Sequence, residues 1–165
     1  MTRLQVPPTL ELFTIPVAVI EATAAFLRDR GESGVEGTVL WLGEVVSDVE
    51  ATIIEPYVPE QIAYRTAHGL AVEVTRRGLN ELIRWLPPGI FVLARVHSHG
   101  EDAYHSDTDD QNMIISHEGA ISIVVPNFAW DGLDLARCSV NRLQHGQGWV
   151  ELSSDEVMQR LRIER

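Results

Sequence analysis

The chain has 165 residues, a formal net charge of -11 and a pI near 4.9. This length corresponds to one ordinary domain that is large enough to bury a core. Hydrophobic residues make up 45% and charged residues 22%, which is typical of a globular protein and not of a disordered one. The acidic balance argues against nucleic acid as a partner, because phosphate binding requires clustered Lys and Arg.

Cysteine usage and the first residues indicate the compartment. Cys138 is the sole cysteine, which excludes a disulfide within the chain and a zinc site built on cysteines. The opening stretch MTRLQVPPTLELF has no basic start followed by a continuous apolar run, and no stretch approaches 18 apolar residues. We therefore expect a cytoplasmic protein without membrane contact, organised as a single domain over residues 1–165.

The first half of the chain predicts two helices among strands. Pro16 suits the first turn of a helix that runs to about Asp29 and is closed by Gly31. Residues 75–86 carry apolar side chains at helical spacing and are followed by two prolines and a glycine. The predicted strands are Thr9 to Phe13, Gly37 to Gly43, Val49 to Val58 and Leu70 to Val74.

The second half predicts further strands and a closing helix. Ser153 and Glu156 have the spacing of a capping box for a helix that reaches Ile163. The order of elements is neither strictly alternating nor all-β, so we expect an α+β domain with a mixed, mostly antiparallel sheet flanked by helices. The predicted strands are Ile90 to His99, Ala120 to Pro126, Leu135 to Leu143 and Trp149 to Leu152.

Two histidines end the predicted strand IFVLARVHSH. His97 and His99 are separated by one residue, so strand geometry places both side chains on one face, close enough to share an ion, while Ser98 points to the other face. A histidine pair of this kind also arises by chance. A catalytic zinc needs three protein ligands and an open position for water, so a third ligand has to come from elsewhere.

The stretch HSDTDD after the histidines offers this third ligand. Ser106 and Asp109 form an S-x-x-D unit at the start of a predicted short helix. In the simpler interpretation, Ser106 is only a helix N-cap and Asp109 a carboxylate in the first turn. Both interpretations can hold together, because a cap fixes the geometry that a ligand needs.

A zinc hydrolase also needs a base that takes a proton from the attacking water. Glu36 is the candidate, because it stands at the entrance of an apolar strand where a carboxylate can face a site. The alternative is a solvated loop residue, like neighbouring Glu32.

The combination resembles the JAMM (MPN) metalloprotease family, in particular its small stand-alone prokaryotic members. Glu36 is followed seven places later by Gly43, with VLWL between them; H-S-H follows after a long gap, and then S-x-x-D. The resemblance extends from about Glu36 to Val125, and the stretch AISIVVPNFA is similar to the continuation seen in that family. It implies the layered, cytidine-deaminase-like α+β fold of this family.

The resemblance also implies a role for each residue. His97, His99 and Asp109 would bind one zinc ion per chain, with a water molecule as the fourth ligand. Glu36 would act as general base and later protonate the leaving amine, and Ser106 would hydrogen-bond the water or the oxyanion.

The chain departs from the family pattern in two places. Gly100 stands where the family commonly has proline after the second histidine, which predicts a more mobile loop. Six residues separate His99 from Ser106, where the family usually has seven, so Asp110 is an alternative ligand to Asp109. His105 is either a substrate contact or a spare loop histidine.

The resemblance implies an isopeptidase or peptidase that removes or processes a ubiquitin-like protein. Conjugates of such a protein would be the substrate, and activating and conjugating enzymes would be associated proteins. One alternative is a metal-free scaffold of the same fold that only binds partners, as do members that lack the glutamate or a ligand. Another is a zinc hydrolase that acts on a different small amide or on a carrier tail.

Overall fold

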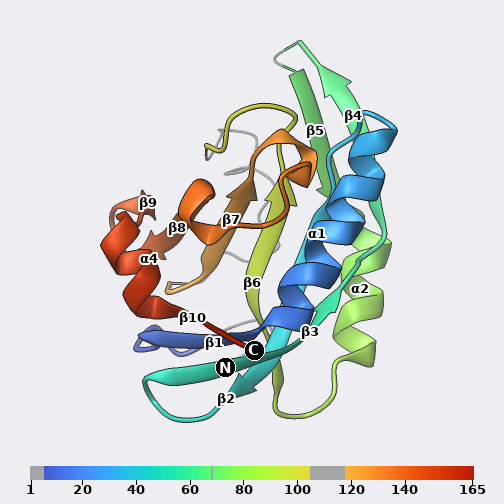
Figure 1. Cartoon of the computed structure of the whole chain (residues 1–165). Helices are drawn as coiled ribbons and strands as arrows, with labels where there is room; N and C mark the ends of the chain where they lie inside the picture. Colours follow the sequence, from blue (N-terminus) through green and yellow to red (C-terminus); the bar gives the residue numbers. More distant parts are fainter. Residues whose placement is uncertain (1–5, 68, 105–117) are drawn as a thin grey trace.

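The computed structural model describes residues 6–67, 69–104 and 118–165, and it has the α+β class expected from the sequence (Figure 1). Most strands form one curled sheet in the order β10-β1-β3-β2-β6-β7-β8-β9, whereas β4 and β5 form a separate hairpin. The strands are β1 (Leu12–Pro16), β2 (Thr38–Val45), β3 (Glu50–Tyr57), β4 (Gln61–Thr66), β5 (Gly69–Val74), β6 (Ile90–Ser98), β7 (Ile121–Val125), β8 (Ser139–Gln144), β9 (Gly148–Glu151) and β10 (Leu161–Glu164).

The pairing of these strands is mostly antiparallel. Strand β2 runs antiparallel to both of its neighbours, β3 and β6, and the pairs β4–β5, β7–β8 and β8–β9 are also antiparallel. Strand β1 is parallel to β3 and β10, and β6 is parallel to β7. In the strand order, β2, β6 and β7 lie at the centre of the sheet. Each of these strands begins or ends beside the two histidines.

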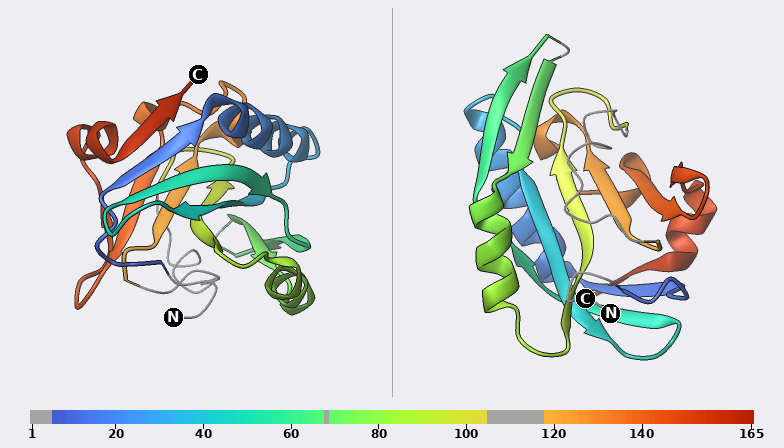
Figure 2. Two further views of the ribbon diagram at one scale, coloured as in Figure 1. Left: turned by 90° about the horizontal axis from the view of Figure 1, so that it is seen from below. Right: turned by 180° about the vertical axis from the view of Figure 1, so that it is seen from behind.

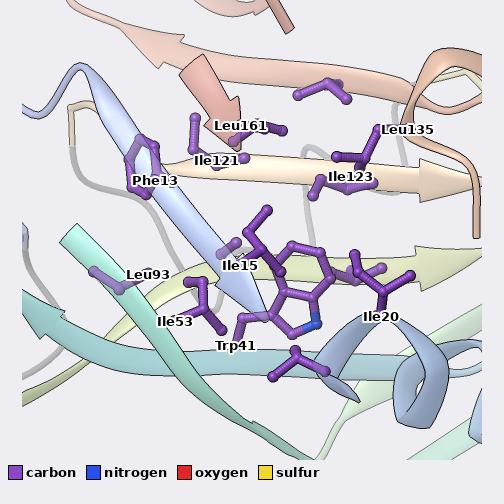
Figure 3. Packing of buried hydrophobic residues seen from close by; sticks show 14 of the residues in the cluster. Phe13, Ile15, Ile20, Trp41, Ile53, Leu93, Ile121, Ile123, Leu135 and Leu161 are labelled. Atoms are coloured by element: carbon purple, nitrogen blue, oxygen red, sulfur yellow. The ribbon is translucent and has the colours of Figure 1, made fainter. Parts of the chain in front are cut away.

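Helix α1 (Val17–Glu32) covers one face of the sheet and closes the larger core. Pro16, with φ of -61°, occupies the N-cap position, and the helix buries an apolar stripe that includes Ile20 and Leu27. Trp41 of β2 is 1% exposed and donates a hydrogen bond from its indole N–H to Thr23 of the helix at 2.9 Å. Figure 3 shows this ring among aliphatic side chains contributed by several strands and by α1.

The opposite face of the sheet carries helix α2 (Arg76–Trp85), so that the two longer helices lie on different sides (Figure 2). The Thr75 hydroxyl caps α2 by accepting a hydrogen bond from the amide of Gly78 at 2.9 Å. Leu82 of α2 belongs to a smaller core together with Leu40 and Leu42 of β2. Among the described residues, no helix combines the length and apolar character needed to cross a bilayer.

Three sequence predictions of elements are wrong in detail. The first strand spans Leu12–Pro16 and not Thr9 to Phe13, since its partner β3 begins only at Glu50 and pairs with Leu12. Strand β4 was not predicted, because none of its residues is buried and its sequence lacks a clean alternation of apolar and polar residues. Gly31 does not close α1; the helix continues to Glu32 and is followed by Gly34 with φ of +69°.

The last helix is also shorter than predicted. Helix α4 covers Ser154–Arg160, and its capping box between Ser153 and Glu156 is confirmed. The chain then becomes strand β10, which pairs with β1 in parallel. The open edge of β1 supplies backbone hydrogen-bonding partners that a helical continuation to Ile163 would leave unused. Two short 3-10 turns, η1 (Asn127–Ala129) and η2 (Leu135–Arg137), connect β7 to β8.

Candidate metal centre

The two histidines lie at the end of β6, in the middle of the sheet. His97 is 3% exposed and pairs with Thr38 of β2 on one side and with Val124 of β7 on the other. His99 is 6% exposed and continues the line of the strand, with its amide donating to the carbonyl of Val125 at 2.9 Å. The backbone of this segment is thus held by the neighbouring strands, which restrains both imidazole rings.

The relative position of the two rings fits a shared ion. Their centroids are 5.1 Å apart, and the ring planes meet at 60°. A tetrahedral zinc ion about 2.0–2.1 Å from one nitrogen of each ring would hold the ring centres about 5 Å apart. Imidazole nitrogens are also preferred donors for zinc, so the pair supplies two ligands of the right type and spacing.

Ser98, between the two histidines, ties them to the strand that follows Glu36. Its amide donates to the Gly37 carbonyl at 3.0 Å, and its hydroxyl accepts from the Gly37 amide at 3.1 Å. Together with the pairing of Thr38 to His97, these bonds place the residue before Gly37 beside His99. The sequence predicted only that Ser98 faces away from the histidines. It did not predict that Ser98 hydrogen-bonds the residue before β2.

Glu36 therefore lies at the same end of the sheet as the histidines, and on their side of it. Directly opposed residues of antiparallel strands point to the same face, so Glu36 shares a face with Thr38 and with both imidazoles. Its side chain is buried, with 7% exposure, which excludes the solvated-loop alternative. Its carbonyl accepts a hydrogen bond from the Nε of Arg30 in α1 at 3.0 Å, so the helix end fixes the backbone of the candidate base.

Gln61 stabilises the β2 edge next to this site. Its side-chain amide accepts from the Thr38 amide at 2.7 Å and donates to the Thr38 carbonyl at 2.9 Å. Strand β3 ends at Tyr57, which pairs with Leu40, and so does not reach Thr38. Gln61 thus replaces a neighbouring strand at the residue that faces His97, a role that its isolated position in the sequence does not reveal.

Tyr104 flanks the second histidine. Its ring centroid lies 4.7 Å from that of His99 in an edge-on arrangement, and the residue is 55% exposed. Tyr104 therefore lies between the buried imidazole of His99 and the solvent. Sequence reasoning did not single out this residue.

The histidine-bearing face carries further buried polar groups. Arg95, two residues before His97, is 4% exposed, donates to the Ser122 hydroxyl at 3.0 Å and lies 5.8 Å from the centroid of the Trp149 ring. Asn141 donates to the Ser139 hydroxyl at 2.9 Å in the same part of the sheet. A buried polar group costs desolvation free energy unless it is hydrogen-bonded. These hydrogen bonds therefore reduce the free-energy cost of burying polar side chains on this face.

The remaining predicted site residues lie outside the described part of the chain. These are Ser106 and the alternative ligands Asp109 and Asp110, together with His105. Among residues 6–67, 69–104 and 118–165, no three His, Cys, Asp or Glu side chains come together in a group that could hold a metal ion. The described residues thus bring together His97, His99 and the backbone that precedes Thr38, while the predicted third ligand is not described.

No protein-family model matches the chain. The fold is similar to that of solved structures of protein DSY2949 from Desulfitobacterium hafniense (TM-score 0.60, 12% identity, 93% of this chain and 94% of that one) and of a protein from Salinibacter ruber (TM-score 0.54, 14% identity, 90% of each chain). At these identities the likeness concerns the fold alone.

One relative is much more similar in sequence. It is the protein named Probable metalloprotease y4jG from Sinorhizobium fredii, which is 38% identical over 141 residues, covering 85% of this chain and 86% of that protein. Similarity at this level over most of both chains cannot come from a shared fold alone. The chain therefore belongs to the same family as this probable metalloprotease.

Proposed function

We propose that the protein is a zinc-dependent metalloprotease of the JAMM type, which hydrolyses a peptide or isopeptide bond at the tail of a ubiquitin-like protein. The observation that carries the proposal is the pair of adjacent, buried imidazoles at the end of β6, with the buried Glu36 two residues before the strand that pairs with them. The name of the relative from Sinorhizobium fredii supports a metal-dependent peptidase in general. The zinc ion, the JAMM assignment and the ubiquitin-like substrate rest on the sequence resemblance.

In this proposal His97 and His99 hold the ion through their imidazole nitrogens, and Asp109 is the third ligand. The ion would supply Lewis acidity, which makes a water molecule acidic enough to attack at neutral pH and polarises the scissile carbonyl. The chain's own part is to hold both rings in a fixed orientation and to keep the site partly dry. Their burial to 3% and 6% exposure serves both purposes.

Glu36 carries the proton in this mechanism. It accepts the proton from the attacking water and returns it to the amine that leaves, so one carboxylate serves both steps. A carboxylate at this place is suited to the task because it is buried and its backbone is fixed by Arg30 and by the bonds between Gly37 and Ser98. Ser106 would donate a hydrogen bond to the developing oxyanion, a contribution on the order of a hundredfold to a thousandfold in kcat.

An extended tail suits the edges beside the site. The β4–β5 hairpin forms its own two-stranded sheet, and β4 begins at Gln61, which is bonded to Thr38 beside the histidines. Strand edges bind extended peptides through main-chain hydrogen bonds, while side-chain pockets select the sequence. In this proposal the extended tail of the substrate would lie along an edge of the hairpin and reach the histidines from there.

The experiment that tests the proposal compares Glu36→Gln with Glu32→Gln, a matched control at an exposed position on the preceding helix. Each protein is stripped with a chelator, titrated with zinc and assayed on a ubiquitin-like protein that carries a cleavable extension. We expect about one zinc per chain in wild type and both variants, and a loss of at least a hundredfold in kcat in Glu36→Gln alone. Undiminished turnover in Glu36→Gln would exclude the assigned base, and absence of zinc binding in wild type would exclude the function.

The same assay separates the proposed substrate from the alternatives. A short peptide that carries only the tail sequence is offered beside the folded substrate. Cleavage of the folded substrate at a much higher kcat/KM supports a ubiquitin-like protein, whereas equal cleavage of both favours a zinc hydrolase of another tail. Binding of the folded protein without cleavage and without zinc favours the scaffold.

A further inference from the structure

Three consecutive residues next to the histidines have a left-handed backbone. Asn127, Phe128 and Ala129 have φ values of 53°, 51° and 58°, and they are the only residues other than glycine with positive φ in the described part of the chain. For residues with a Cβ this conformation costs roughly 1–2 kcal/mol each. Asn tolerates it, whereas Phe and Ala gain nothing from it locally, so tertiary contacts must hold the turn.

These contacts are made with the end of β6. The Phe128 amide donates to the His99 carbonyl at 2.8 Å, and the Asn127 amide donates to the Glu101 carbonyl at 2.9 Å. The His99 amide in turn donates to Val125 at 2.9 Å. Both backbone groups of His99 are therefore bound to the segment that contains the left-handed turn.

The Phe128 side chain lies between this histidine segment and the end of α1. A Cβ built on Gly100 would be 2.7 Å from the Cζ atom of Phe128. A Cβ built on Gly31 would overlap the Cβ atom of the same residue. Both glycines thus leave room for one aromatic residue, and the ring occupies the space that a side chain at position 100 would take.

The end of α1 leads directly to the candidate base. The Gly34 amide donates to the Gly31 carbonyl at 2.9 Å, and Arg30 binds the Glu36 carbonyl at 3.0 Å. Phe128 therefore contacts, on one side, the segment that carries the second histidine and, on the other, the helix end that fixes the glutamate. These two segments are far apart in the sequence.

We propose that Phe128 is a positioning residue, which holds His99 and Gly100 against the end of α1 and so fixes the second imidazole for the metal. This inference rests on the proposed function, since it assigns Phe128 a role toward the ion that the two histidines would bind. It explains the strained turn and the glycine at position 100 by one contact. Groups that hydrogen-bond a metal ligand commonly contribute a factor of about 10–100 to metal affinity, and a packing contact on the ligand's own segment is expected to contribute less.

The first experiment measures zinc affinity of the full chain by competition with a chromophoric chelator. Phe128→Leu keeps an apolar side chain but lacks the ring tip that reaches Gly100. Phe91→Leu is the matched control. Phe91 is also partly buried, and it lies on β6 at the end away from the histidines. We expect zinc affinity to fall at least threefold in Phe128→Leu and less than threefold in Phe91→Leu, with the unfolding midpoint of each zinc-free variant measured in parallel.

The second experiment tests the contact between the ring and Gly100. Gly100→Ala should weaken zinc binding at least tenfold, because its methyl group meets the ring at 2.7 Å. In the double variant with Phe128→Leu this effect should shrink by at least threefold, since the ring tip is gone. Additive effects of the two changes would overturn the proposed contact.

The outcomes separate this inference from the proposed function. If wild type binds no zinc, the proposed function fails. If wild type binds zinc and Phe128→Leu lowers only the unfolding midpoint, with zinc affinity unchanged within threefold, Phe128 has a structural role and the inference alone fails.

Discussion

The two faces of the central sheet differ in what they bury. The face under α1 is apolar: Phe13, Ile15 and Trp41 lie there with 1%, 0% and 1% exposure, and the indole N–H is bonded to Thr23. The other face has a smaller apolar cluster, and along β6 and β8 it also carries polar side chains, with Arg95 and Asn141 almost fully buried. Both faces are made by the same strands, because alternate residues point in opposite directions.

This difference separates stability from chemistry. An apolar face gains free energy in proportion to the area removed from water. A buried polar face gains little net stability, because each polar group gives up water for a protein partner of similar strength. The face under α1 therefore supplies most of the stability of the sheet. The polar groups of the other face are better suited to binding than to stabilising the fold.

The largest effect is expected on the polar face. His97→Ala removes one of the two described imidazoles, so the purified protein should lose the zinc ion of the proposed function, while the far side of the sheet is untouched. Zinc per chain by elemental analysis checks this, with His145→Ala as the control at an exposed turn. Retention of one tightly bound zinc in His97→Ala would remove His97 from the ligand set.

A matching change on the apolar face should affect stability alone. Phe13→Ala empties a fully buried position, which we expect to lower the free energy of unfolding by about 3–5 kcal/mol. Urea unfolding followed by tryptophan fluorescence measures this loss. The variant that remains folded should bind zinc like wild type; a large loss of zinc affinity would mean that the two faces are coupled more tightly than the comparison suggests.

Changes at the edge of β2 near Thr38 are expected to have a smaller effect on stability than Phe13→Ala. Gln61→Ala leaves the buried amide and carbonyl of Thr38 without their side-chain partner, at a cost of about 1–3 kcal/mol in unfolding free energy. Gln61→Glu should also lower the stability, because a carboxylate still accepts from the Thr38 amide but cannot donate to the Thr38 carbonyl, which its second oxygen would repel. Gln147→Ala, at an exposed turn, is the control, and an equal cost in all three variants would contradict the role given to Gln61.

The capping box of α4 is expected to give a smaller effect, far from the polar face. Ser153→Ala should lower the unfolding free energy by about 0.5–2 kcal/mol. The pKa of Glu156 is lowered by its hydrogen bonds to the Ser153 backbone and side chain. A lowered folded-state pKa stabilises the protein above the unfolded-state pKa, and this part is lost as the pH falls through the folded-state value. Acid titration of wild type should show this loss, and Ser153→Ala should show less of it.

The smallest effect concerns Cys138. Burial raises the pKa of this thiol to about 12, with a further contribution from Asp134. The unfolded thiol ionises above roughly pH 9 and the folded one only near 12, so its contribution to stability is intact below pH 9 and falls as the pH rises between these values. Alkylation of native protein at pH 8 should therefore be much slower than that of unfolded protein. Equal rates would show that the thiol is accessible in the folded state.

The sequence indicated the elements whose signals are local. Buried strands such as β2, β6 and β7 appear in the sequence as long apolar or β-branched runs, and the capping box of α4 depends on two residues three positions apart. Strand β4 was not predicted, because its residues are only partly buried and form no apolar run. Strand β10 escaped because only the open edge of β1, more than a hundred residues earlier, makes its residues extended.

The candidate site divides in the same way. The sequence by itself determined which groups are available, because the spacing of His97 and His99 on a strand already places both imidazoles on one face. Only the tertiary structure decided what surrounds them: Ser98 fastening β6 to Gly37, Gln61 standing in for a strand at Thr38, and Phe128 filling the space beside Gly100. Such contacts join segments tens of residues apart, and their geometry depends on the packing of the whole sheet, which no local pattern encodes.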